Sequence, residues 1–205
     1  MSRTKILSTF VAGLVLLLGG ALYASGSMAA EAMNWFGGPV YDGPPALGAT
    51  AALVKAGGGP ENFTFPKALV SMLGEKTVNA EVAKLNKQYG EKDTKAFLDG
   101  MTYAVKDGLQ RATEAGVTLP SAPPDLKGTA LAKTLVQAGT VDGTFWSGHL
   151  FDKALSHPIH NTVMADIEAK SGRDADQNVH RILNQAMYDV AQALGMKDVG
   201  LASLH

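Results

Sequence analysis

Cysteine is absent from this chain of 205 residues. Its absence excludes disulfides, thiol catalysis, a lipid anchor on cysteine and covalent haem attachment through a Cys-x-x-Cys-His motif. Charged residues are also few, at 18%, and the formal net charge is −1. A chain with so little positive charge offers no basic surface to nucleic acid or to an anionic membrane. Aromatic residues make up only 7%, whereas alanine and methionine are frequent, and this composition favours helices over sheets.

Residues 1–30 have the layout of a secretory signal peptide. Arg3 and Lys5 precede the apolar run Phe10–Leu18, and small residues at Ser27–Ala30 suit cleavage. The alternative is an uncleaved membrane anchor, but the apolar run is short for a span of about 20 residues. The sequence therefore predicts a periplasmic or secreted protein without stable membrane insertion after cleavage.

Beyond residue 43, the sequence contains two consecutive segments that resemble each other. An arm rich in glycine and proline, residues 31–43, comes first and is expected to lie on the surface of the domain. The segment that starts at Pro44-Pro45 then matches the segment that starts at Pro123-Pro124. Further matches follow in the same order: Thr77-Val-Asn-Ala-Glu with Thr162-Val-Met-Ala-Asp, and Met101-Thr-Tyr-Ala-Val with Met187-Tyr-Asp-Val. Such ordered matches predict two repeats, residues 44–120 and 125–205, joined by a Pro-rich hinge at 121–124.

Apolar residues recur at helical spacing in both repeats, and no stretch shows the alternation typical of strands. The pattern is clearest in Lys92–Ala115 and in its counterpart Asp174–Leu194. A third helix is predicted at Pro158–Ala169, with proline in the first turn and Ser156 or His157 as its cap. We expect an all-α fold in which two tandem pseudo-symmetric helical repeats pack into one compact helical domain.

The histidines are unequally divided between the repeats. All five lie in the second repeat, at His149, His157, His160, His180 and His205. The second repeat also has extra residues around Thr140–Asp152, which bring in Trp146 and His149. In a diverged duplicate, the copy that carries reactive side chains is the better candidate for a site. The alternative is drift, which would leave these histidines solvated and without function.

Two of the histidines have a spacing that suits a metal ion. His157 and His160 are three residues apart at a predicted helix start, so both imidazoles can lie on one side of the helix. With His149 from the preceding helix, three nitrogens can meet around zinc or another divalent metal. Asp152 and Asp166 are candidate carboxylates that support these ligands. The zinc motif His-Glu-x-x-His is absent.

A single histidine among apolar side chains suits haem b instead. Iron takes one imidazole, and the porphyrin faces require apolar contacts such as Trp146, Phe151 and Met164. The simpler explanation of these side chains is ordinary core packing. His180 lies beside the apolar stripe of the last helix, where it can approach a ligand bound between the repeats or make one boundary hydrogen bond.

Three segments resemble the truncated globins. Leu53–Phe63, with its Gly-Gly-Gly-Pro run, is similar to the glycine–proline and aromatic segment of that family. Trp146–Phe151 followed by His157 resembles the run that leads to the proximal histidine, and Tyr89-Gly90 with Phe97–Val105 resembles the Phe-rich helix. The resemblance implies non-covalent haem b, a small gas ligand and His157 on the iron.

Together these observations predict an exported helical protein that binds haem or a metal through histidine and carries or senses a small ligand. No pair of acids and no Ser/His/Asp pattern stands out, so the sequence does not support a hydrolase, and it favours a non-enzymatic role while leaving other enzyme classes open. The alternative is a structural or interaction module without a cofactor, which binds a partner protein or a second copy of itself as a homodimer.

Overall fold

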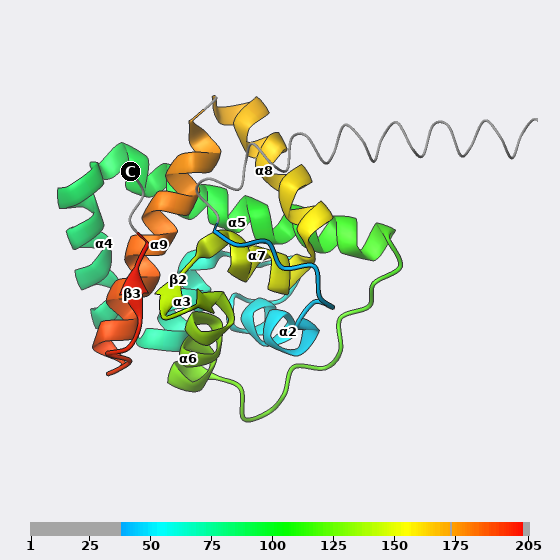
Figure 1. The fold of residues 1–205 in the computed structure, drawn as a ribbon, viewed down its shortest axis with the longest axis horizontal. Coiled ribbons are helices and arrows are strands. Elements are labelled where there is room, and N and C mark those ends of the chain that lie inside the picture. Colours follow the sequence, from blue (N-terminus) through cyan, green and yellow to red (C-terminus); the bar gives the residue numbers. More distant parts are fainter. Residues whose placement is uncertain (1–37, 173, 203–205) are drawn as a thin grey trace, which may run out of the picture.

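The computed structural model describes residues 38–172 and 174–202 (Figure 1). The predicted signal peptide, most of the predicted arm and His205 lie outside these residues. Helices dominate the described part of the chain, which confirms the predicted all-α class. The helices are α2 (Leu47–Ala56), α3 (Phe65–Leu73), α4 (Glu75–Tyr89), α5 (Glu91–Glu114), α6 (Gly128–Gly139), α7 (Ser147–Leu155), α8 (His157–Ser171) and α9 (Ala175–Ala193). Within the described ranges, none of these helices has both the length and the apolar character needed to cross a membrane.

A small sheet, which the sequence did not predict, accompanies the helices. It consists of β1 (Thr140–Val141), β2 (Thr144–Phe145) and β3 (Gly200–Leu201). β1 and β2 form an antiparallel hairpin, and β3 adds to β2 in parallel. The two turn residues, Asp142 and Gly143, have φ angles of 48° and 76°, as the Asp-Gly turn of a tight hairpin requires. Strands of two residues are too short to show an alternating pattern, so periodicity missed them.

Single residues with positive φ separate several consecutive helices. Gly74 joins α3 to α4 with φ 81° and ψ 151°, and Gly90 joins α4 to α5 with φ 88° and ψ 153°. The same conformation returns at Ser156 (φ 84°, ψ 148°) and at Gly172 (φ 103°, ψ 163°). This region is accessible mainly to glycine. Gly74, Gly90 and Ser156 are each the single residue between two helices, whereas α9 begins three residues after Gly172. At each of these junctions the next helix packs against the previous one.

The two halves of the chain contain the same series of helices. Helices α2 to α5 have 10, 9, 15 and 24 residues, and α6 to α9 have 12, 9, 15 and 19. Contacts between the halves are also reciprocal, because α3 packs on α6 as α2 packs on α7, and α5 on α8 as α4 on α9. α3 and α7 start at Phe65 and Ser147, and α4 and α8 start at Glu75 and His157. In this register Thr77 does not correspond to Thr162, nor Met101 to Met187, so the helix series supports the predicted duplication and those two sequence matches do not. The duplication stays a prediction.

One hydrophobic core extends through both halves. Its most deeply buried side chains include Phe63, Leu131, Phe145, Met164 and Ile182. Burial of each large apolar side chain stabilises the fold by roughly 1.5–3 kcal/mol. Helix α7 contacts α2, α5, α6, α8 and α9 and lies near the middle of the molecule (Figure 1). A polar residue on α7 is therefore held by several neighbouring elements.

An acid pair outside this core makes stability depend on pH. Glu81 on α4 lies beside Asp189 on α9, which also pairs with Lys84 at 2.5 Å. Burial, followed by the neighbouring Asp189, raises the pKa of Glu81 from 4.5 to about 7. The folded state therefore holds a proton between these values that the unfolded state releases. The free energy of unfolding should fall as pH rises through this range.

Glu81→Gln should remove this dependence, because glutamine keeps the shape and cannot ionise. Relative to the native chain, we expect the variant to be more stable at pH 8 than at pH 4 by about 1–2 kcal/mol, a value reduced for solvent screening. Urea denaturation at both pH values measures the difference. An equal effect of the substitution at pH 4 and at pH 8 would contradict the prediction.

Candidate metal centre

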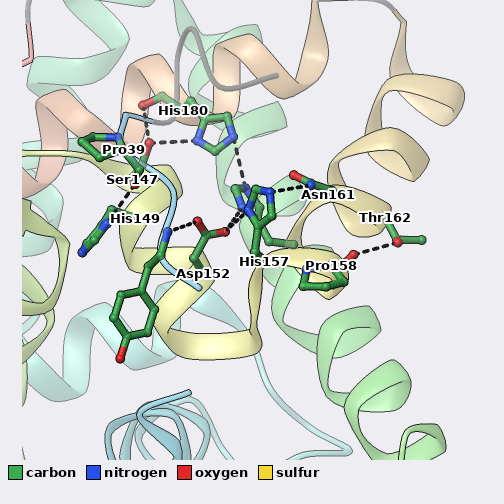
Figure 2. Close-up of polar contacts among 11 residues, drawn as sticks. Pro39, Ser147, His149, Asp152, His157, Pro158, Asn161, Thr162 and His180 are labelled. Carbon is green, nitrogen blue, oxygen red and sulfur yellow. Dashed lines mark hydrogen bonds and ion pairs between the residues drawn. The ribbon is translucent and has the colours of Figure 1, made fainter. Parts of the chain in front are cut away.

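Three side chains from α7 and α8 converge on one point. Asp152 Oδ1 accepts hydrogen bonds from His157 Nδ1 at 3.0 Å and from His160 Nδ1 at 2.7 Å (Figure 2). One ligand atom from each of the three residues lies within 4.8 Å of the others. The two histidines that the sequence paired therefore do come together, and Asp152 joins them directly.

The junction between α7 and α8 creates this arrangement. Asp152 lies in the last turn of α7, and His157 and His160 lie in the first turn of α8. The reversal at Ser156 folds the start of α8 back onto the end of α7. Ser156 takes the predicted cap position, but its side chain makes no capping hydrogen bond. The backbone conformation at Ser156, and not its hydroxyl, positions the histidines.

Ser156 is expected to be strained. A residue other than glycine in this conformation costs about 1–3 kcal/mol. We expect Ser156→Gly to stabilise the protein by about 1 kcal/mol, because relief of strain exceeds the added entropy of the unfolded chain. This corresponds to a rise in Tm of about 2–4 °C, measured by thermal unfolding.

The matching junction in the first half supplies the reverse experiment. Nothing lies within 4 Å of a Cβ placed on Gly74, so Gly74→Ser introduces backbone strain without a clash. This variant should lose about 1 kcal/mol or more. Loss of stability in Ser156→Gly, or no change in either variant, would show that the junctions are not strained.

Asp152 is held as a buried carboxylate. Its relative exposure is 2%, and its second oxygen, Oδ2, accepts the backbone N–H of Tyr41 at 3.0 Å. Burial alone would raise the pKa of Asp152, but the hydrogen bond and charge of His160, with Tyr41 and His157, bring it below its usual value. The group is therefore ionised at neutral pH and presents a negative charge to the two imidazoles.

A second set of polar residues extends the site inward. His160 Nε2 lies 3.4 Å from His180 Nε2, and His180 Nδ1 lies 2.8 Å from Ser147 Oγ. The backbone N–H of Ser147 donates to Asn184 Oδ1 at 2.8 Å. Burial, together with nearby His160, lowers the pKa of His180 to about 3, so this imidazole is neutral at physiological pH.

These contacts lead from His160 through His180 and Ser147 to Asn184, and we call them the inner chain of the site. The inner chain differs from the serine–histidine pair that a hydrolase would need. A serine within reach of an imidazole can act as a nucleophile. Ser147, however, has 0% exposure, and His180 is 3% exposed, so a substrate has no access to either group in this conformation. The arrangement is suited to positioning His160, and not to attack on a substrate.

The other predicted site residues lie around this group or away from it. His149 Nδ1 lies 2.9 Å from the carbonyl oxygen of Pro39 and points away from Asp152 (Figure 2). Asp166, a predicted supporting carboxylate, pairs instead with Arg111. Phe151 stacks on the ring of His160, with centroids 5.1 Å apart.

Two further predicted residues belong to the surrounding packing. Met164 is buried, at 1% exposure, and Trp146 is half-buried with its ring against Gly38. An internal cavity beside Phe151 has a volume of only about 50 Å³, far below the several hundred Å³ of a typical cofactor pocket. The haem prediction gains no support at this position.

Comparison with known proteins does not assign the chain to a family. A scan of the chain against protein-family models gave no match, and searches of curated proteins and of solved structures gave none either. The resemblance to truncated globins therefore stays a prediction. The distances among Asp152, His157 and His160 are the observations that indicate a function for the site.

Proposed function

We propose that the protein binds one divalent transition metal ion through His157, His160 and Asp152, with zinc as the best fit. The convergence of these three ligand atoms within 4.8 Å of one another is the observation that supports the proposal. Two imidazole nitrogens and one carboxylate oxygen form a ligand set that zinc accepts. The negative charge of Asp152 offsets part of the charge of the ion in a buried place.

The spacing of the ligands is close to that of a filled site. Zinc lies about 2.0–2.2 Å from nitrogen and oxygen ligands in tetrahedral geometry, so neighbouring ligand atoms are separated by about 3.3 Å. The contacts of Asp152 with His157 and His160 are 3.0 and 2.7 Å. These two distances would each open by a few tenths of an ångström to admit the ion.

The same geometry supports a carrier or sensor. The described residues supply three ligands, and tetrahedral zinc takes four, so one position remains for water or a small ligand. The side chain of His157 is 15% exposed and those of His160 and Asp152 are 8% and 3% exposed. The ion would therefore enter from the side of His157, and the function requires no catalytic turnover.

The competing explanation is a purely structural cluster, in which Asp152 only stabilises two imidazoles. A titration with zinc in competition with a chromophoric chelator distinguishes the two. We expect the native chain to bind one ion, and His157→Gln to bind at least 100-fold more weakly, because one of three ligands is lost.

His149→Gln is the matched control, since it removes a buried histidine of the same helix pair outside the ligand group. Its zinc affinity should stay within about threefold of the native value, because its contact with Pro39 is not part of the site. Equal affinities of all three proteins, or no binding by the native chain, would refute the proposal.

A further inference from the structure

We propose that His180 and Ser147 are positioning residues that hold His160 in the tautomer required by the metal. This inference depends on the proposed metal site and adds residues that lie outside its ligand group. His180 contacts the nitrogen of His160 that faces away from Asp152. Histidine ligands of metal ions commonly donate their second ring N–H to such a partner, which fixes the orientation and tautomer of the ring.

The contacts of the inner chain determine which nitrogen of each imidazole carries the proton. A metal ion at Nδ1 of His160 leaves the single ring proton on Nε2, and this proton is donated to Nε2 of His180. His180 then carries its own proton on Nδ1 and donates it to Ser147 Oγ at 2.8 Å. The hydroxyl of Ser147 in turn donates to the carbonyl oxygen of His180 at 3.3 Å. Every contact then has one donor and one acceptor.

If the donor and acceptor roles in the inner chain are reversed, one contact has no hydrogen. If His160 keeps its proton on Nδ1, His180 must donate from Nε2, and its Nδ1 must accept the proton of Ser147. No hydrogen then remains between Ser147 Oγ and the carbonyl oxygen of His180. In the metal-free protein, His160 donates the proton on Nδ1 to Asp152. When an ion at Nδ1 replaces this proton, every contact of the inner chain has a hydrogen to donate.

Packing keeps the chain of contacts rigid. Ser147 is fully buried at the start of α7, and its backbone is held by Asn184 of α9. Phe151 stacks on His160 and meets His180 edge-on, with centroids 5.1 and 5.8 Å apart. Neither imidazole can rotate without displacing this ring. The positions of His160 and His180 are thus set before an ion arrives.

Zinc affinity of variants tests the role of His180. We expect His180→Phe, which removes the acceptor, to lower zinc affinity 10- to 100-fold, as loss of a partner of a ligand usually does. His180→Gln restores an acceptor oxygen and should stay within about fivefold of the native chain. Ser147→Ala is a smaller buried change, which keeps the test valid if His180→Phe does not fold, and should lower the affinity at least threefold.

Nitrogen-15 NMR of histidine-labelled, zinc-loaded protein gives an independent measurement. We expect protons on His160 Nε2 and on His180 Nδ1, which a merely structural role of His180 would not require. If the native chain binds zinc, native-like affinity in both His180→Phe and Ser147→Ala would overturn the positioning role and leave the metal site intact. An unprotonated Nδ1 in His180 would also overturn it. If the native chain binds no zinc, both proposals fail together.

Discussion

Asp152→Ala is expected to lower the free energy of unfolding by about 3–5 kcal/mol in the absence of metal. The substitution removes the acceptor of three hydrogen bonds, from His157, His160 and the backbone of Tyr41. Each buried donor left without a partner costs about 1–3 kcal/mol, so the loss of this shared acceptor has a total effect of this size. The whole fold is worth only about 5–15 kcal/mol, so this loss is a large part of it, and Tm should fall by about 6–20 °C.

A surface carboxylate on the same helix pair provides the control. Asp166 pairs with Arg111, and the two side chains are 37% and 32% exposed. Removal of an exposed pair costs at most about 1 kcal/mol, so Asp166→Ala should shift the urea midpoint only slightly. Equal losses in the two variants would mean that the Asp152 cluster contributes no more than a surface ion pair.

Zinc is expected to stabilise the native chain by about 4 kcal/mol when its free concentration is 1,000 times Kd. An ion that binds only the folded state shifts the folding equilibrium by mass action. The change corresponds to a rise in Tm of about 8–16 °C for a chain of this size. Thermal unfolding of metal-free protein, followed with and without added zinc, measures it.

Two controls test whether the rise in Tm comes from zinc bound to the proposed ligands. Magnesium prefers six oxygen ligands, so it should produce no comparable shift at a site made of two imidazoles and one carboxylate. His160→Gln should abolish the effect of zinc. An equal rise in Tm with magnesium, or a rise that persists in His160→Gln, would assign the stabilisation to weak binding elsewhere.

The contrast between the two halves supports the proposed metal site. Counting from the junctions Gly74 and Ser156, the positions of Asp152, His157 and His160 correspond to Val70, Glu75 and Val78 in the first half. Those residues cannot hold a transition metal ion. The first half has a similar series of helices and lacks the three proposed ligands.

One hydrogen bond is present at corresponding places in both halves. The backbone N–H of Phe65 at the start of α3 donates to the side chain of Thr102 at 3.0 Å. The backbone N–H of Ser147 at the start of α7 donates in the same way to Asn184 at 2.8 Å. This shared contact supports the predicted duplication, and in the second half it holds Ser147 of the inner chain.

The sequence predicted the helices and half of the site for physical reasons. Helical periodicity in the long segments follows from burial of one face, and it is confirmed by α5, α8 and α9. The pairing of His157 with His160 follows from local geometry, because residues three apart on a helix lie on one side. Both inferences use only spacing within one element.

The rest of the site depends on how separate elements pack. The reversal at Ser156, which brings Asp152 to the histidines, uses a backbone conformation that serine rarely adopts. His180 and Ser147 reach the site only because α9 packs on α7 and α8. His149 lies on the same helix as Asp152 but bonds to Pro39 of the N-terminal arm. Sequence spacing contains none of this tertiary information.

X-ray absorption at the zinc edge, on native protein loaded with one equivalent of zinc, tests the metal site most directly. The proposed site predicts a shell of nitrogen and oxygen ligands at about 2.0–2.2 Å that includes two imidazoles, and loss of one imidazole in His160→Gln. A spectrum without imidazole ligands, or one that is unchanged in His160→Gln, would contradict the assignment of the metal to Asp152, His157 and His160.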